Sequence, residues 1–189
     1  MEHFYESIDG WFSYDYLYKD AVERAEDGAL FVEIGSFKGR SSAYMAVEIV
    51  NSGKKIQFDC VDPQKLLSHY AESAKEQPTV FEGYGEEHFH KRLESVAGYY
   101  NLVTETSDVA VQRYADRSID FLMVDGDHTY EAVKNDILNF LPKMKIGGVI
   151  TGDDAFADDV RRAAQDAATE AGLEVNFVHG IHLWIEITE

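Results

Sequence analysis

Residues 118–144, SIDFLMVDGDHTYEAVKNDILNFLPKM, decide the fold that we predict for this chain. The apolar run FLMV at 121–124 leads directly into the acidic turn DGDH. From Tyr130 onward, apolar residues recur at the spacing of one helix face. The stretch therefore predicts a buried strand at 118–125, a polar turn and a helix at 130–144. Because Asp and Gly are common in turns, the rest of the chain has to show whether this turn carries chemistry.

Short apolar runs and longer amphipathic segments alternate along the whole chain. Further strands are predicted at 29–35, 55–62, 101–106 and 147–154. Further helices are predicted at 13–27, 39–53, 86–98 and 158–172, and a β-hairpin at 173–187. This alternation indicates an α/β protein with a Rossmann-like, doubly wound and mostly parallel sheet, which a C-terminal antiparallel hairpin completes.

We predict a single domain over residues 1–189. Its first part, 1–28, is interpreted as an aromatic helical cap, which either forms a lid over a bound ligand or packs on the core or on a second subunit. A second subunit at this cap would make the protein a homodimer. Residues 63–98 fit the alternation least and hold two of the three prolines, so we interpret them as a variable excursion on the substrate side.

The composition limits the partners that we expect. The chain has 35 acidic and 17 basic residues, and its formal net charge of −18 repels phosphate backbones, so we expect no nucleic-acid partner. The single cysteine, Cys60, lies in the apolar stretch IQFDCVD, and one thiol allows no disulfide within the chain. The sequence shows no signal peptide and no long apolar segment, so we expect a cytoplasmic protein without a membrane partner.

The loop EIGSFKG at 33–39 follows a predicted strand and opens a predicted helix. Its glycines do not match the G-x-G-x-x-G of dinucleotide sites, and GSFKGRS is one residue short of a P-loop. The remaining pattern is E-x-G-x-x-x-G, which is accompanied by an acidic residue at the end of the next strand. Asp62 is at that position. A carboxylate there can accept both ribose hydroxyls of a ligand. The alternatives are a tight turn without a ligand and a turn aspartate before Pro63.

At these residues the sequence resembles the class I S-adenosylmethionine-dependent methyltransferases. VEIGSFKGRSS at 32–42 is similar to their first motif and VDP at 61–63 to their second. Residues 118–154 resemble a small-molecule O-methyltransferase branch that includes the macrocin-type sugar methyltransferases. The resemblance implies the sheet order 3-2-1-4-5-7-6, with the last hairpin supplying strands 6 and 7.

The resemblance also implies how S-adenosylmethionine would be bound. The first loop and the helix after it would hold the methionine part, Asp62 the ribose, and Ser107 with Asp108 the adenine. The residues expected to bind the cofactor are Glu33, Gly35, Ser36, Gly39, Ser41, Asp62, Ser107, Asp108 and Asp125.

Three aspartates are predicted to lie at the ends of adjacent strands. Asp125 ends one strand, and Asp153 with Asp154 ends the next, so about 4.8 Å would separate their backbones. Their carboxylates would repel unless a cation lies between them. Oxygen ligands suit Mg²⁺ best, with Ca²⁺ or Mn²⁺ as alternatives, and metal-dependent members of the family hold their ion in this pattern. Otherwise Asp153 and Asp154 only cap the following helix.

Asp127 and His128 are the candidates for a catalytic base. The sugar methyltransferases use the second Asp of DGD, which is Asp127 here. Catechol-type members use a Lys three residues after the metal-binding Asp, and His128 occupies that position. We predict Asp127 as the base and keep His128 as the alternative.

The sequence thus predicts an S-adenosylmethionine-dependent, divalent-metal-assisted O-methyltransferase acting on a small hydroxylated molecule such as a sugar, a catechol or a natural product. One alternative is an NAD(P)-dependent short-chain reductase, because Tyr130 and Lys134 form the Y-x-x-x-K of that family. The first loop lacks the glycine pattern of those reductases. The other alternative is a non-catalytic cofactor-binding protein of the same fold.

Overall fold

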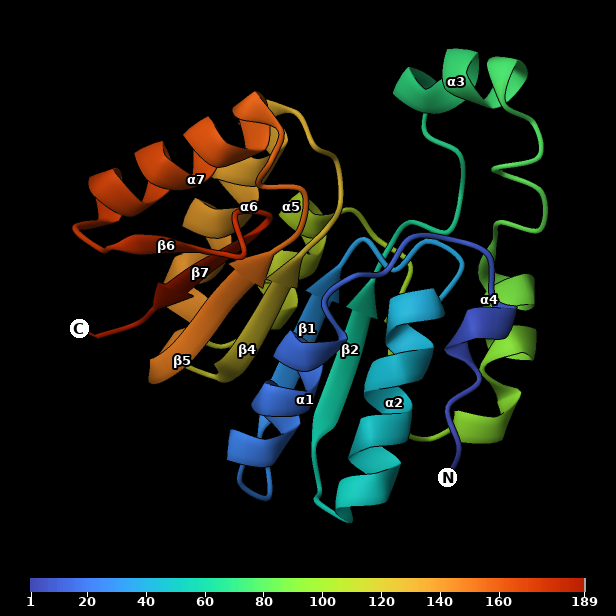
Figure 1. The fold of residues 1–189 in the computed structure, drawn as a ribbon, viewed down its shortest axis with the longest axis horizontal. Coiled ribbons are helices and arrows are strands. Elements are labelled where there is room, and N and C mark those ends of the chain that lie inside the picture. Colours follow the sequence, from blue (N-terminus) through green and yellow to red (C-terminus); the bar gives the residue numbers. More distant parts are fainter. Residues whose placement is uncertain (189) are drawn as a thin grey trace.

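The computed structural model describes residues 1–188 and all of their side chains except that of His69. Its seven strands form one sheet in the order β3-β2-β1-β4-β5-β7-β6, in which β7 is antiparallel to both of its neighbours (Figure 1). The predicted sheet order and fold class are therefore confirmed. The strands are β1 (Leu30–Ile34), β2 (Gln57–Val61), β3 (Asn101–Val103), β4 (Ile119–Val124), β5 (Met144–Gly152), β6 (Val175–Val178) and β7 (His182–Glu186).

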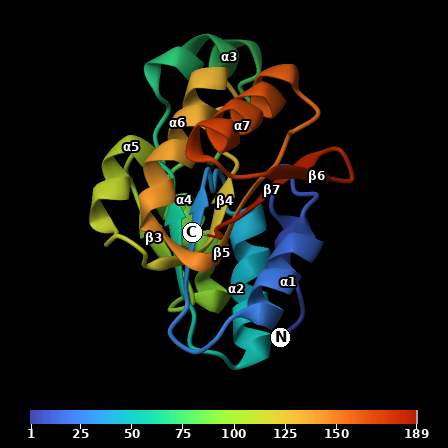
Figure 2. The same cartoon turned by 90° about the vertical axis from the view of Figure 1, so that its left-hand side faces the viewer.

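Helices cover both faces of the sheet. The helices are α1 (Asp15–Arg24), α2 (Arg40–Ser52), α3 (Ala71–Glu76), α4 (Glu86–Arg92), α5 (Ser107–Ala110), α6 (Tyr130–Phe140) and α7 (Asp158–Ala171). Figure 2 shows α1 and α2 on one side of the sheet and α5, α6 and α7 on the other. Each layer has its own buried apolar cluster, and alternate residues of β1 serve the two: Phe31 faces α1 and α2, whereas Val32 and Ile34 face the opposite layer.

Several boundaries differ from the prediction. The strand predicted at 101–106 ends at Val103, and the helix predicted at 13–27 covers Asp15–Arg24. The helix predicted to reach residue 144 ends at Phe140, and a short 3-10 segment, Leu141–Lys143, follows. Pro142 explains this end, because proline has no N–H to donate within a helix. The strand predicted from 147 begins at Met144, since the turn at Pro142 lets the chain join β4 earlier.

The excursion at 63–98 contains α3, α4 and a 3-10 segment at Glu94–Val96. Helix α3 stands away from the sheet, beyond the carboxyl ends of the strands (Figure 1), and none of its residues is buried. Helix α4 covers residues 86–92 of the helix predicted at 86–98, and its Phe89 is buried against the α2 layer. The predicted single domain extends one residue, Glu189, beyond the described residues. Within those residues, no helix is both long and apolar enough to cross a membrane.

Candidate active site at the carboxyl ends of the strands

Three loops begin at the same level of the sheet. Ile34, Val124 and Gly152 pair across β1, β4 and β5, so Gly35, Asp125 and Asp153 come next on adjacent strands. The register therefore gathers the first glycine loop and the acidic turns at one edge, as expected for the ligand edge of a parallel sheet.

Gly35 is required by the contact between two of these loops. Its φ is +90°, and a Cβ there would lie 2.0 Å from the backbone oxygen of Asp125. Gly39 has the same φ, and a Cβ there would lie 2.6 Å from Leu93 and 2.9 Å from Phe89. Both glycines thus allow protein segments to approach, a reason that the sequence did not reveal. Their predicted contact with a cofactor stays a prediction.

Glu33 is fully buried and points toward the α1–α2 layer. Its carboxylate accepts hydrogen bonds from the hydroxyl of Tyr18 at 2.6 Å and from the hydroxyl of Ser42. Burial raises the pKa of Glu33, and the hydrogen bonds, including one with the buried Ser41, oppose that rise. Glu33 and Ser41 are therefore tied to each other beneath the first loop.

Asp62 organises the second loop. Its buried carboxylate accepts hydrogen bonds from the backbone N–H groups of Phe37 and Gln64, each at 2.8 Å, and from the hydroxyl of Tyr84 at 2.7 Å. Burial raises the pKa of Asp62, and these donors oppose that rise. Nearby, within the described part of the chain, the buried side-chain oxygen of Gln64 has no hydrogen-bond partner, and that of Ser36 has no well-aligned one, although it interacts with the Glu33 carboxylate. Unsatisfied buried polar atoms beside a carboxylate suit a polar ligand.

The structure brings Asp125, His128 and Asp154 together. Nε2 of His128 lies 3.4 Å from Asp125 Oδ1, and Nδ1 lies 3.1 Å from Asp154 Oδ2. Burial raises the pKa of Asp125 to about 6, and a hydrogen bond with Asp125 raises the pKa of His128. One potential ligand atom from each of the three lies within 4.8 Å of the others, so these residues could hold a metal ion.

Asp153, the third predicted metal ligand, is directed elsewhere. Its Oδ1 lies 3.2 Å from Nε2 of the buried His182, and its Oδ2 accepts a hydrogen bond from Ser13 at 3.4 Å. The other ring nitrogen of His182 lies 2.7 Å from the hydroxyl of Tyr16. The structure thus places Asp153 in contact with the N-terminal segment, while His128 occupies the space between the other two aspartates.

Asp127 faces the excursion. Its Oδ1 accepts a hydrogen bond from the N–H of Thr129 at 2.9 Å in the turn that precedes α6. Burial and the nearby charge of Asp127, which also hydrogen-bonds Tyr70, raise the pKa of Tyr70 to about 12. Asp127 and Asp125 therefore have different surroundings, although they are two residues apart.

Of the two residues predicted at the adenine, Asp108 is exposed and Ser107 is half-buried. The hydroxyl of Ser107 donates to Oδ1 of the buried Asp136 on α6 at 2.5 Å. Burial raises the pKa of Asp136 to about 6, and the charges of Asp108 and Asp127 add to the rise.

The sequence predicted an aromatic N-terminal cap, but not the contacts that its hydroxyls make with the site. The hydroxyl of the fully buried Tyr14 donates to Oδ2 of Asp125 at 2.6 Å. Together with Ser13, Tyr16 and Tyr18, it brings hydroxyls to four acidic or imidazole groups of the site. The signal was present in WFSYDYLYKD, where tyrosines alternate with other residues, but the sequence did not show which groups they meet. Tyr14 and Tyr18 pack on the core, so at these two positions the segment forms part of the buried structure.

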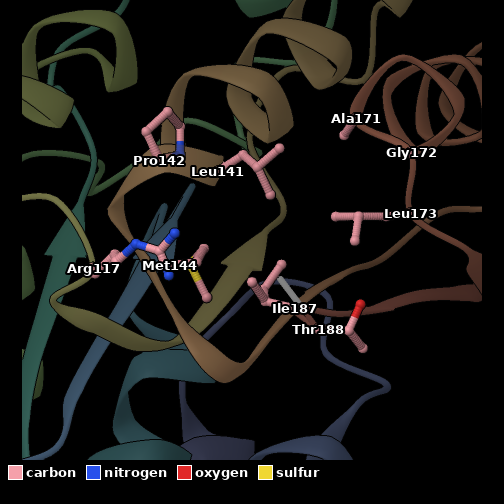
Figure 3. A pocket seen from close by; sticks show the side chains of 9 residues that line it. All are labelled: Arg117, Leu141, Pro142, Met144, Ala171, Gly172, Leu173, Ile187 and Thr188. Atoms are coloured by element: carbon pink, nitrogen blue, oxygen red, sulfur yellow. The ribbon is translucent and has the colours of Figure 1, made fainter.

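Two cavities lie outside this acidic edge. One of about 320 Å³ lies at the opposite edge of the sheet, against the ends of α6 and α7. Figure 3 shows its mainly apolar lining with one guanidinium, that of Arg117. It contains no group that the predicted chemistry needs.

The fold is that of a class I S-adenosylmethionine-dependent methyltransferase, as defined by the sheet order, the first loop and the acidic edge. A family model described as Methyltransferase domain matches residues 32–155, and the chain belongs to this family. The family model covers all three loops that form the acidic edge.

Solved structures share this fold. One is the O-methyltransferase NovP, with 15% identity, coverage of 93% of this chain and 79% of NovP, and a TM-score of 0.66. Another is cofactor-bound Rv0187 from MTB, with 16% identity, coverage of 98% of this chain and 86% of Rv0187, and a TM-score of 0.64. A methyltransferase from Geobacter sulfurreducens is similar at 14% identity, with 96% and 82% covered and a TM-score of 0.61. Among curated proteins, y4gI from Sinorhizobium fredii is 30% identical over 109 residues, which are 52% of this chain and 12% of y4gI.

Proposed function

We propose that this chain transfers a methyl group from S-adenosylmethionine to a hydroxyl of a small molecule, assisted by a divalent cation. The observation that carries the proposal is the meeting of Asp125, His128 and Asp154 at the edge that also holds Asp62. Membership of a methyltransferase family supports the transferred group. The similarity to NovP, which is an O-methyltransferase, supports oxygen as the acceptor atom.

The cofactor would lie across the first and second loops. Asp62 offers a carboxylate to the ribose, and Gln64 offers a buried oxygen that has no hydrogen-bond partner among the described residues. Tyr84 donates to the same carboxylate at 2.7 Å, so we expect its hydroxyl to share Asp62 with the ribose or to move aside. The residues present therefore fit a polar, hydroxyl-bearing ligand.

The cation would be held by Asp125 and Asp154. His128 already lies between them, and Asp153 could reach the site only by leaving His182. Two carboxylates with an imidazole suit Mn²⁺ better than Mg²⁺, whereas three carboxylates suit Mg²⁺ or Ca²⁺. When bound, such a cation lowers the pKa of a coordinated hydroxyl.

Asp127 is the group that we assign to proton removal. It lies two residues beyond Asp125 and, like Tyr70, faces the excursion where the acceptor would enter. Asp127 accepts the hydroxyl proton as the acceptor oxygen bonds to the methyl carbon and the carbon–sulfur bond breaks. His128 is bound between two carboxylates, which leaves it less available for this role.

The contacts of Tyr130 and Lys134 argue against the reductase alternative, in which these two residues would be catalytic. The hydroxyl of Tyr130 donates to Asp166 at 2.8 Å, and Lys134 pairs with Glu170 at 3.0 Å, so both side chains face α7. The non-catalytic alternative would keep cofactor binding without turnover, so activity with any acceptor dismisses it.

The test begins with cofactor binding. S-adenosylhomocysteine should raise the melting temperature, because a ligand that binds only the folded state stabilises it, and NADH should not. The reverse result would support the reductase.

With an acceptor in hand, Asp127→Asn should lower the methyl-transfer rate by roughly 10²–10⁴-fold while S-adenosylhomocysteine still binds. His128→Ala is the matched comparison and should cost the rate less. If Asp127→Asn keeps the full rate and His128→Ala loses it, His128 is the base.

A further inference from the structure

A cavity of about 300 Å³ lies beside the first loop, away from the acidic edge. It is bounded by the N-terminal segment, the first loop and the excursion, and neither the proposed metal ligands nor Asp127 line it. The lining residues are Asp9, Gly10, Trp11, Phe37, Lys38, Thr79 and Val80.

Lys38 is the unusual residue of this cavity. Its side chain is 2% exposed, yet its carboxylate partner, Asp9, is 88% exposed and lies 3.6 Å away. That distance exceeds a hydrogen bond, and a solvent-facing carboxylate compensates a buried ammonium poorly. The ammonium also lies 5.5 Å from the centre of the Phe37 ring, which adds a cation–π contact. These two contacts only partly offset the cost of removing the cation from water, and an anion in the cavity would offset more of it.

Arg40 adds a second cation next to the same segment. A Cβ on Gly10 would lie 3.7 Å from Cβ of Arg40, so the two backbones are close. The guanidinium donates to the carbonyl of Ile8 at 2.9 Å and lies 5.6 Å from the ring of Tyr5, while its buried Nε has no partner in the described part of the chain. Among the described residues, no carboxylate pairs with Arg40, although the chain carries 35 acidic residues. Arg40 thus adds a positive charge next to the cavity, although only Lys38 and Asp9 among the charged residues line it.

Two aromatic side chains, Trp11 and Phe37, also line the cavity. Trp11 is 75% exposed, and its ring lies nearly parallel to that of Phe37, with centroids 6.2 Å apart and 25° between the planes. Phe37 in turn contacts Tyr84, whose hydroxyl bonds Asp62. The cavity therefore adjoins the proposed cofactor site through Phe37.

We propose that this cavity binds a planar aromatic molecule with an anionic group, whose ring lies against Trp11 and Phe37 and whose anion pairs with Lys38. The chemistry fits a hydroxylated aromatic acid, for example a dihydroxybenzoate. Because neither Asp127 nor the proposed metal ligands line this cavity, the bound molecule is not assigned as the methyl acceptor, and the binding does not rest on the proposed function.

The experiment measures binding of 3,4-dihydroxybenzoate and of neutral catechol by calorimetry, with and without saturating S-adenosylhomocysteine. The acid should bind at least about tenfold more tightly than catechol, the scale of a charge-assisted hydrogen bond. Lys38→Met keeps the length of the side chain, removes the charge and should abolish this preference. Trp11→Ala should weaken both compounds.

Asp9→Asn provides a test of opposite sign. It removes the carboxylate that competes for Lys38, so affinity for the acid should rise while that for catechol stays the same. Asp9 is exposed, so this variant decides the question if Lys38→Met does not fold. Lys91→Met, which removes an exposed lysine on α4, controls for the change in net charge and should change neither affinity.

The proposal is wrong if Lys38→Met, folded, keeps the preference for the acid, or if Asp9→Asn does not raise it. It is also wrong if Lys38→Met weakens S-adenosylhomocysteine and leaves dihydroxybenzoate unchanged, because Lys38 would then serve the cofactor. Failure of S-adenosylhomocysteine to bind would count against the proposed function, whereas the measurements without it would still test the cavity.

Discussion

Glu33 shows how single residues determine the geometry of this site. It is fully buried, and the hydroxyl of Tyr18 satisfies one of its oxygens. Tyr18→Phe removes that donor and keeps the ring, so the free energy of unfolding should fall by about 1–3 kcal/mol in urea titrations. Tyr130→Phe removes a comparable but exposed bond, to Asp166, and should cost less than about 0.5 kcal/mol. Equal losses would contradict the role assigned to burial.

Gly35 can be tested against a glycine of the same backbone conformation. Gly35 and Gly28 both have φ +90°, but a Cβ on Gly28 meets nothing within 4 Å. Gly28→Ala should therefore cost only the strain of a left-handed residue, about 1–2 kcal/mol. Gly35→Ala should cost clearly more, because its Cβ would collide with the backbone of Asp125. Similar losses in chemical unfolding would show that the loops move apart easily.

At this scale the sequence predicted which residues gather, but not what each one contacts. Asp125 and Asp154 are both next to a strand end, so strand periodicity places them. The preference of Asp153 for His182 depends on a partner 29 residues away on an antiparallel strand, and no local pattern encodes that. The contact of Tyr14 with Asp125 joins residues 111 apart in the chain.

Helices and strands could be predicted where buried apolar residues recur at a regular spacing along the sequence. The strands and helices around the acidic edge match their predicted positions, apart from the helix end at Pro142 and the early start of β5. The excursion was not predictable in detail, because α3 has no buried residue and therefore no apolar face to read. The sequence allowed two predictions for the N-terminal segment, because aromatic residues suit both a lid and a packed helix.

The contact between α5 and α6 should make stability depend on pH. Burial raises the pKa of Asp136 to about 6, so the folded protein favours its protonated form. This contribution is fully present below the unfolded pKa near 3.8 and is lost as pH rises through about 6. The side chain of the Asp136→Asn variant does not titrate. Relative to this variant, the free energy of unfolding of the wild type should fall by at most about 3 kcal/mol as the pH rises across that window.

Urea unfolding at several pH values between these limits measures the difference. Asp108→Asn should move the loss to lower pH, because the charge of Asp108 is one cause of the raised pKa. If the profiles of wild type and Asp136→Asn run parallel, the buried carboxylate is not protonated in the folded protein.

On the scale of the whole molecule, the acidic surface and the acidic edge act in the same direction. A formal net charge of −18 disfavours the compact state through self-repulsion, and Asp125, Asp153 and Asp154 add to it locally. Monovalent salt should stabilise the protein by screening these charges, without any specific site. A metal site should add a separate stabilisation, since an ion that binds only the folded state shifts the unfolding equilibrium.

We therefore expect Mg²⁺ or Mn²⁺ near neutral pH to raise the melting temperature beyond NaCl of equal ionic strength, and EDTA to reverse the difference. At a free metal concentration about one hundred times the dissociation constant, binding should raise the free energy of unfolding by roughly 2.7 kcal/mol. Asp154→Asn should remove the specific part, whereas Glu174→Gln, which neutralises an exposed carboxylate elsewhere, should keep it. His128→Ala and Asp153→Ala then identify the third ligand, because only the variant that loses a ligand should weaken binding. If divalent and monovalent salts act alike in wild type, no specific metal site exists, and His128 between Asp125 and Asp154 is a structural ion pair.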